Sequence, residues 1–271
     1  INYLQLAMLL EKTNKSEEIL YLMRKARNIE PNNHEIYNFL GAYQKRNNNL
    51  DSAIKYYQKA ISINKNYYSA IFNLANLYKQ KGKTKKSILL YKKVISINET
   101  HFKSFYNLAN IYKDEENYEL AIINYKKSIN IEPNFTNALN NLANIYLELG
   151  LINKAKEIYE NALKVNSSDA SIINNLGNTY KYLGQYSNAE ELYKKAISIN
   201  NNIESIFNLS ILYLLLNNYK NGLSLYEKRF SEKNNCKLIA SPNLRKCENK
   251  PNKGDKLLIV SEQGLGDTVQ F

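Results

Sequence analysis

Apolar and polar positions recur along residues 1–230 with a period of 34 residues. The tetrapeptide NLAN at 73–76 returns at 107–110 and 141–144, then as NLGN at 175–178 and as NLSI at 208–211. Extending this alignment gives seven units: 1–33, 34–67, 68–101, 102–135, 136–169, 170–202 and 203–230. Apolar residues within a unit follow helical spacing in two stretches, so the pattern predicts two amphipathic helices per unit.

Four positions of the unit carry most of the pattern when each unit is numbered from 1 to 34. Position 7 is always Leu, position 8 is always small, position 20 is small in six units, and position 24 is Tyr in six: Tyr57, Tyr91, Tyr125, Tyr159, Tyr193 and Tyr226. This pattern resembles the tetratricopeptide repeat over residues 1–230. Small residues let two helices approach closely, and stacking buries each pair against the next. We therefore expect an all-α superhelix of seven helix–turn–helix repeats.

Asparagine recurs on a second face of the first helix of each unit. Position 6 carries Asn73, Asn107, Asn141, Asn175 and Asn208, and position 9 carries Asn76, Asn110, Asn144 and Asn178. Asn is a poor helix former, about 0.5 kcal/mol worse than Ala, yet its amide both donates and accepts hydrogen bonds. Position 13 of the same face has no Asn, so composition alone does not explain the ladder. The alternative is that Asn at positions 6 and 9 is simply common in this family.

In the family this face lines a concave groove. The pattern resembles the asparagine ladder of the eukaryotic O-GlcNAc transferase superhelix, which implies binding of extended peptide through its backbone. These nine asparagines are therefore the predicted peptide-binding residues. Because they are expected to point away from the core, replacing Asn107, Asn141 and Asn175 by Ala is expected to leave the fold unharmed.

Lysines add charge to the predicted groove. Lys45, Lys79, Lys113 and Lys181 stand at position 12, which favours acidic or flexible polar segments as partners. The clamp with which some relatives hold chaperone-tail carboxylates needs Lys at position 5, and none is present there. We therefore do not expect a chaperone-tail receptor.

The net charge of +12 raises the possibility of nucleic-acid binding. Many lysines, however, fall in pairs at positions 25 and 26, on the helix expected to face outward, and only 5 of the 37 basic residues are Arg. Arg is the residue best suited to bidentate phosphate and guanine contacts, so we expect no nucleic-acid partner. The longest apolar run in the repeats, ILYLLL at 211–216, is too short to span a membrane.

The few metal-binding and redox residue types do not form sites. Cys236 and Cys247 lack a CxxC spacing and suit a reducing, cytoplasmic setting. His34 and His101 lie at equivalent turns between units without ligand-spaced partners, so no metal site is expected.

The helical period is lost after Phe230. Residues 231–256 are polar, carry two prolines and a glycine, and are expected to form a linker. The segment 257–271, LLIVSEQGLGDTVQF, then predicts a short buried strand, a glycine turn and the start of a helix. Its glycines match neither a complete dinucleotide fingerprint nor a P-loop.

The stretch YEKRF at 226–230 followed by LLIVSEQGLGDTVQF resembles the junction of bacterial proteins in which tetratricopeptide repeats precede a GT-B glycosyltransferase domain related to the heptosyltransferases. Residues 257–271 would then begin a truncated α/β Rossmann-like domain, and the full-length protein would use a sugar nucleotide donor. In the resemblance Asp267 matches the suspected catalytic base; alternatively it only caps the new helix.

Two functions follow from these observations. The leading one is a peptide-binding scaffold that serves as the targeting region of a glycosyltransferase, with no catalysis and no cofactor within residues 1–271 themselves. The alternative is a stand-alone assembly scaffold without enzyme activity.

Overall fold

The computed structural model describes residues 3–10 and 16–231. In that part of the chain the secondary structure consists of fourteen α-helices and no strand. The first eight are α1 (Tyr3–Leu10), α2 (Ser16–Ile29), α3 (His34–Arg46), α4 (Leu50–Ile63), α5 (Tyr68–Gln80), α6 (Thr84–Ile97), α7 (Phe102–Asp114) and α8 (Tyr118–Ile131). The other six are α9 (Thr136–Glu148), α10 (Ile152–Val165), α11 (Ala170–Tyr182), α12 (Tyr186–Asn200), α13 (Ile203–Leu215) and α14 (Tyr219–Ser231).

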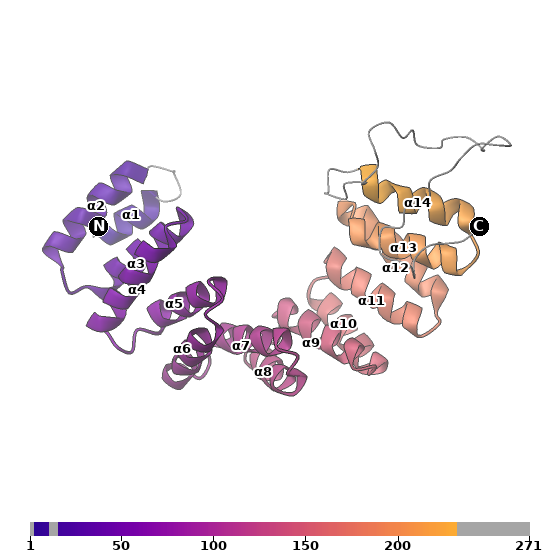
Figure 1. Ribbon diagram of the computed structural model, residues 1–271, viewed down its shortest axis with the longest axis horizontal. Coiled ribbons are helices and arrows are strands. Elements are labelled where there is room, and N and C mark those ends of the chain that lie inside the picture. Colours follow the sequence, from indigo (N-terminus) through magenta and orange to yellow (C-terminus); the bar gives the residue numbers. More distant parts are fainter. Residues whose placement is uncertain (1–2, 11–15, 232–271) are drawn as a thin grey trace, which may run out of the picture.

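The helices form antiparallel pairs that stack in chain order, α1 with α2 through α13 with α14, and together they follow an arc (Figure 1). In the middle of the arc α5 and α7 lie toward its inner side, and α6 and α8 lie toward its outer side. The prediction of an all-helical solenoid is confirmed. The predicted strand and glycine turn at 257–271, and nearly all of the expected linker, lie outside the described residues.

In five helix pairs, α3 with α4 through α11 with α12, a buried tyrosine of the second helix packs against a small residue of the first. The ring at position 24 is at most 1 % exposed in Tyr57, Tyr91, Tyr125, Tyr159 and Tyr193. A Cβ added to Gly41 would lie 2.6 Å from the Tyr57 ring, and one added to Gly177 would lie 2.7 Å from the Tyr193 ring. Position 8 is therefore small because the tyrosine ring occupies the adjacent space.

In the second to seventh repeats the first helix is followed by a left-handed residue at position 15. This residue is Gly82, Gly150 or Gly184 in three repeats, Asn48 or Asn217 in two, and Glu116 in one, with φ between 57° and 72°. In the turn after α5, for example, Gly82 N donates to Lys79 O and Lys83 N donates to Tyr78 O. These two bonds satisfy the terminal carbonyls and reverse the chain, which places the second helix antiparallel to the first.

Candidate functional site

The position-9 asparagines accept hydrogen bonds from the buried tyrosines. The tyrosine hydroxyl donates to the asparagine Oδ1 fifteen residues earlier in four successive repeats: Tyr91 to Asn76, Tyr125 to Asn110, Tyr159 to Asn144 and Tyr193 to Asn178. The oxygen–oxygen distance is 2.5 Å at Tyr91 and 2.7 Å at Tyr193. Burial raises the pKa of Tyr91 to about 12, so the hydroxyl keeps its proton and acts as a donor at neutral pH.

The same asparagine oxygens also accept a bond from the next repeat. Nδ2 of the position-6 asparagine donates to Oδ1 of the position-9 asparagine thirty-one residues earlier. The pairs are Asn107 to Asn76 at 3.0 Å, Asn141 to Asn110 at 3.0 Å, and Asn175 to Asn144 at 3.3 Å. The ladder is thus a hydrogen-bonded network that links each repeat to its neighbour and ties both to the core.

Position 5 supplies a further acceptor for the position-6 amides. Asn141 Nδ2 also donates to Tyr106 Oη at 3.3 Å, and Asn175 Nδ2 also donates to Asn140 Oδ1 at 3.0 Å. Both amide hydrogens of Asn141 and Asn175 therefore have partners inside the protein. At the outer junctions position 5 is the acceptor instead of position 9: Asn73 donates to Asn38 and Asn208 donates to Asn174.

These bonds determine which polar atoms remain for a ligand. Among the described residues, no hydrogen bond involves Nδ2 of the position-9 asparagines or Oδ1 of Asn107, Asn141 and Asn175. All of these side chains are half-buried and so remain in part accessible. The face accordingly offers a row of amide donors beside a row of amide acceptors, each held in one orientation by its internal bond.

The network changes the expected energetic role of the asparagines. From the sequence, Asn107, Asn141 and Asn175 were expected to be replaceable by Ala without harm to the fold. That expectation does not fit the structure, because each of the three donates at least one inter-repeat hydrogen bond from a half-buried position. Helical spacing places a residue on a face but does not reveal its rotamer or its partner, so the sequence showed the ladder without the bonds.

One member of the network has an unused donor. Asn174 is fully buried, and its Oδ1 accepts from Ser205 Oγ and from Asn208 Nδ2. Its own Nδ2 has no partner among the described residues. The side-chain hydrogen bonds of Asn174 therefore all depend on its Oδ1, and its Nδ2 contributes none within the described chain.

The position-12 lysines differ in their surroundings. Lys45 is exposed, whereas Lys79 and Lys113 are half-buried. Burial is the main cause that lowers the pKa of Lys79; the Asp114 carboxylate opposes the shift and the Lys113 ammonium adds to it. Neither Lys79 nor Lys113 forms an ion pair with a described carboxylate. This part of the first-helix face is therefore cationic, and neither Lys79 nor Lys113 has a direct ion-pair partner within the described chain.

The two histidines pack against aromatic rings, and the candidate base Asp267 is not among the described residues. His34 packs edge-on against Tyr67, with ring centroids 4.4 Å apart, and His101 packs in the same way against Phe72 at 4.7 Å. No cluster of metal-ligating side chains occurs in the described ranges, and none of the helices there could cross a bilayer. Asp267 lies outside the described residues.

Family models described as tetratricopeptide repeat match four stretches of the chain: 34–67, 56–88, 109–150 and 134–202. Among curated proteins, no sequence matches the chain.

Solved structures of repeat proteins are similar in fold. A tetratricopeptide repeat protein from Parabacteroides merdae superposes with a TM-score of 0.65 at 18% identity, covering 86% of this chain and 93% of its own. The Pseudomonas aeruginosa pilF structure has a TM-score of 0.63 at 18% identity, with 74% and 97% covered. YrrB, described as a tetratricopeptide repeat protein with an unusual peptide-binding site, has a TM-score of 0.56 at 20% identity, with 68% and 95% covered. At these identities the similarity shows the fold alone.

Proposed function

Because the chain carries tetratricopeptide repeats, we propose that the asparagine-bearing face of its first helices binds an extended polypeptide segment through the segment's backbone. The observation that carries the proposal is the pair of rows described above, amide N–H donors at position 9 and amide oxygen acceptors at position 6. An extended backbone presents N–H and C=O groups that match both rows. The fixed orientation of the amides lowers the entropy lost on binding.

The lysines would add a preference for charge without setting a motif. Lys79 and Lys113 form no ion pair in the described chain, and Lys45 is exposed nearby in the preceding first helix. A carboxylate on the bound segment would supply the absent ion-pair partner. The proposed ligand is therefore an unstructured, mildly acidic polypeptide segment. A peptide-binding site is described for the structural neighbour YrrB, so this fold is able to carry one.

We further propose that the groove recruits acceptors for a glycosyltransferase. This step rests on the sequence EQGLGDT at 262–268 and on its resemblance to the repeat–GT-B junction. In that case a sugar nucleotide is the donor, and Asp267 acts as the base for the acceptor hydroxyl. The alternative is a stand-alone scaffold, which the groove would serve equally well. The reading frame after codon 271 separates the two: two further βαβ halves support the enzyme, whereas an immediate stop codon refutes it.

The groove is tested by removing its acceptor row. In the variant Asn107→Ala/Asn141→Ala/Asn175→Ala each replaced side chain had one oxygen free for a ligand, worth about 0.5–1.5 kcal/mol per hydrogen bond. Binding of an unstructured acidic probe peptide of Ser, Thr, Val, Gly and Asp should therefore weaken by about tenfold or more in calorimetric titration. A probe of the same sequence with N-methylated amides lacks donors for that row, so it should bind the parent protein weakly.

Two controls accompany the titration. Asn161→Ala changes an exposed asparagine on α10, on the outward-facing side, and should leave binding unchanged. A thermal melt checks that the triple variant remains folded at the titration temperature. If the folded triple variant binds the probe as tightly as the parent protein, the asparagines serve packing alone and the groove proposal is wrong.

A further inference from the structure

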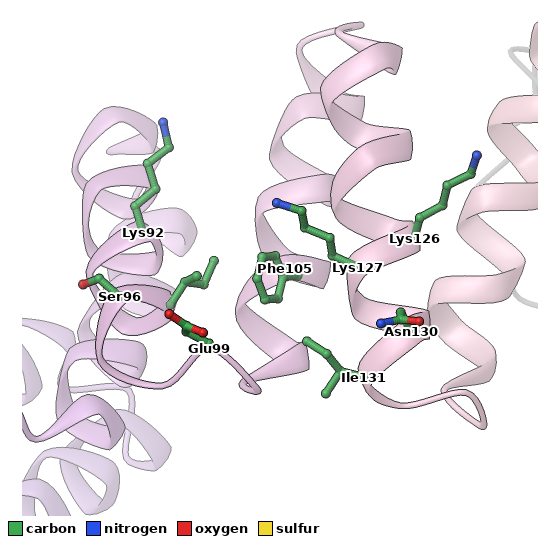
Figure 2. A pocket seen from close by; sticks show the side chains of 9 residues that line it. Lys92, Ser96, Glu99, Phe105, Lys126, Lys127, Asn130 and Ile131 are labelled. Carbon is green, nitrogen blue, oxygen red and sulfur yellow. The ribbon is translucent and has the colours of Figure 1, made fainter.

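A second surface, on the outer side of the arc, has the features of a binding site. A cleft of about 670 Å³ lies between α6 and α8, and its lining includes Lys92, Ile95, Glu99, Phe105, Lys127 and Ile131 (Figure 2). Phe105 comes from α7 and lies between the two outer helices in this view. The cleft is thus formed by the third and fourth repeats together and has an aromatic ring at its centre.

The charges of the cleft are arranged asymmetrically. Lys127 reaches across the opening, with Nζ 5.6 Å from the centroid of the Phe105 ring, and Lys92 rises on the facing helix. Neither lysine forms an ion pair with a carboxylate in the described ranges. Lys126 points away, toward the Tyr146 ring at 6.0 Å, and Glu99 lies at the opposite end from the lysine ammonium groups. One end of the cleft is therefore cationic, and its apolar centre lies directly beside that end.

Lysines at position 25 of one repeat and position 26 of the next, with Phe at position 4 between them, occur together only at the junction of the third and fourth repeats. The first junction has Arg24, Tyr37 and Lys59 at these positions, and the last has Lys194, Ile206 and Lys228. Position 25 is Gln58 in the second repeat and Glu160 in the fifth, where the third and fourth repeats have Lys92 and Lys126. Position 26 of the fifth repeat is Asn161, where the fourth has Lys127. The two adjacent junctions therefore lack one of the two lysines: Gln58 replaces it between the second and third repeats, and Asn161 replaces it between the fourth and fifth. Packing of the solenoid does not require lysines on both walls, since the second–third, fourth–fifth and fifth–sixth junctions stack without one of them.

We propose that this cleft is a second peptide-docking site, separate from the concave groove, which takes an acidic segment carrying one large apolar side chain. The apolar side chain would pack on Phe105 between Ile95 and Ile131. Carboxylates flanking it would pair with Lys92 and Lys127, whose methylene stems cover the apolar side chain. The recess at Phe105 favours an inserted side chain over a flat anionic surface such as a membrane. The absence of arginine from the lining disfavours a nucleic acid.

The test uses residues that the solenoid already accepts. In the cleft variant Lys92→Gln/Lys127→Asn each new residue stands at the equivalent position of another repeat, as Gln58 and Asn161. The control variant Lys93→Gln/Lys195→Asn removes the same charge from exposed lysines that do not line the cleft. The probe is a fluorescein-labelled peptide of Asp and Glu residues around a single Phe. Two matched peptides serve as comparisons: in one the Phe is replaced by Ser, and in the other every Asp and Glu is replaced by Asn and Gln. Binding is followed by fluorescence anisotropy.

The parent protein should bind the acidic Phe peptide more tightly than either matched peptide. The cleft variant should lose roughly tenfold in affinity, as expected for two partly exposed ion pairs, while the control variant should not. Equal losses in the cleft and control variants would mean attraction to net charge alone and would overturn the proposal. Binding to vesicles of phosphatidylserine that depends on Lys92 and Lys127, without binding of the Phe peptide, would overturn it in favour of a membrane surface.

Discussion

The hydrogen bonds of Asn110 predict that this half-buried residue stabilises the fold although it lies on a proposed binding face. Its Oδ1 accepts from Tyr125 Oη in the same repeat and from Asn141 Nδ2 in the next. Tyr125 is fully buried, and burial raises the pKa of its hydroxyl, so the group stays protonated and needs an acceptor. The replacement Asn110→Ala removes that acceptor and leaves the hydroxyl in place.

Two opposing effects determine the size of the change. A buried hydroxyl left without an acceptor costs about 1–3 kcal/mol. Replacing Asn by Ala inside a helix returns about 0.5 kcal/mol through helix propensity. The net expectation is a loss of about 1–2 kcal/mol of unfolding free energy. If helix propensity were the only effect, the unfolding free energy would instead rise slightly. The sign of the change therefore shows whether the hydrogen bond to Asn110 contributes to stability.

A double-mutant cycle with Tyr125→Phe isolates the bond itself. With the hydroxyl already absent, Asn110→Ala should cost about 1 kcal/mol less than it does in the parent protein. Urea unfolding followed by circular dichroism measures the stabilities, and amide exchange in α7 and α8 shows whether the loss is local. Asn161→Ala on α10 controls for propensity. If Asn110→Ala stabilises the protein as much as Asn161→Ala does, the network contributes nothing to stability.

Three further outcomes follow from other features. Glu116→Gly should stabilise the protein by about 0.5 kcal/mol and so raise the melting temperature. Glu116 has a left-handed φ of 57°, which costs a non-glycine residue about 1 kcal/mol, but the greater freedom of glycine in the unfolded chain cancels part of that gain. A lower melting temperature would refute this. Burial lowers the pKa of His101 below its usual 6.5, so its contribution to stability is fully present above about pH 6.5 and is lost as the pH falls further. His101→Phe should flatten the dependence of unfolding free energy on pH between 7 and 5, and an unchanged slope would count against the assignment. Since each repeat contacts only its neighbours and the last repeat has a neighbour on one side only, amide exchange should be faster in α13 and α14 than in the central repeats, and uniform protection would contradict this.

The period of the sequence was sufficient to predict the fold. Leu at position 7, small residues at positions 8 and 20, and Tyr at position 24 specify two helices and the contact between them. The structure shows these residues buried where the repeat places them: Tyr91 beside Ala75, for example, is fully buried. Such features are predictable because they depend on spacing and side-chain volume, which the sequence states directly.

The polar network was only partly predictable. The sequence showed Asn at positions 6 and 9 but not that Tyr125 and Asn141 share one oxygen of Asn110. A signal was present, since Asn at position 9 occurs only in repeats that also have Tyr at position 24. The second repeat weakens that signal, because it pairs Tyr57 with Ala42. The outer cleft could not be predicted for a different reason. The sequence places the paired lysines on an outward-facing helix, but the position of the Phe105 ring between Lys92 and Lys127 depends on how the repeats stack.

The inter-repeat amide bonds also have a mechanical consequence. Asn107, Asn141 and Asn175 each reach back to the preceding repeat on the first-helix side, which faces the inside of the arc. A force that pulls the two tips of the arc apart would lengthen these bonds first, while the tyrosine contacts within each helix pair remain intact. The solenoid should therefore behave as a spring whose stiffness resides in a line of side-chain amides. A ligand that bonds to the same amides would stiffen it further, so binding and elasticity would be coupled.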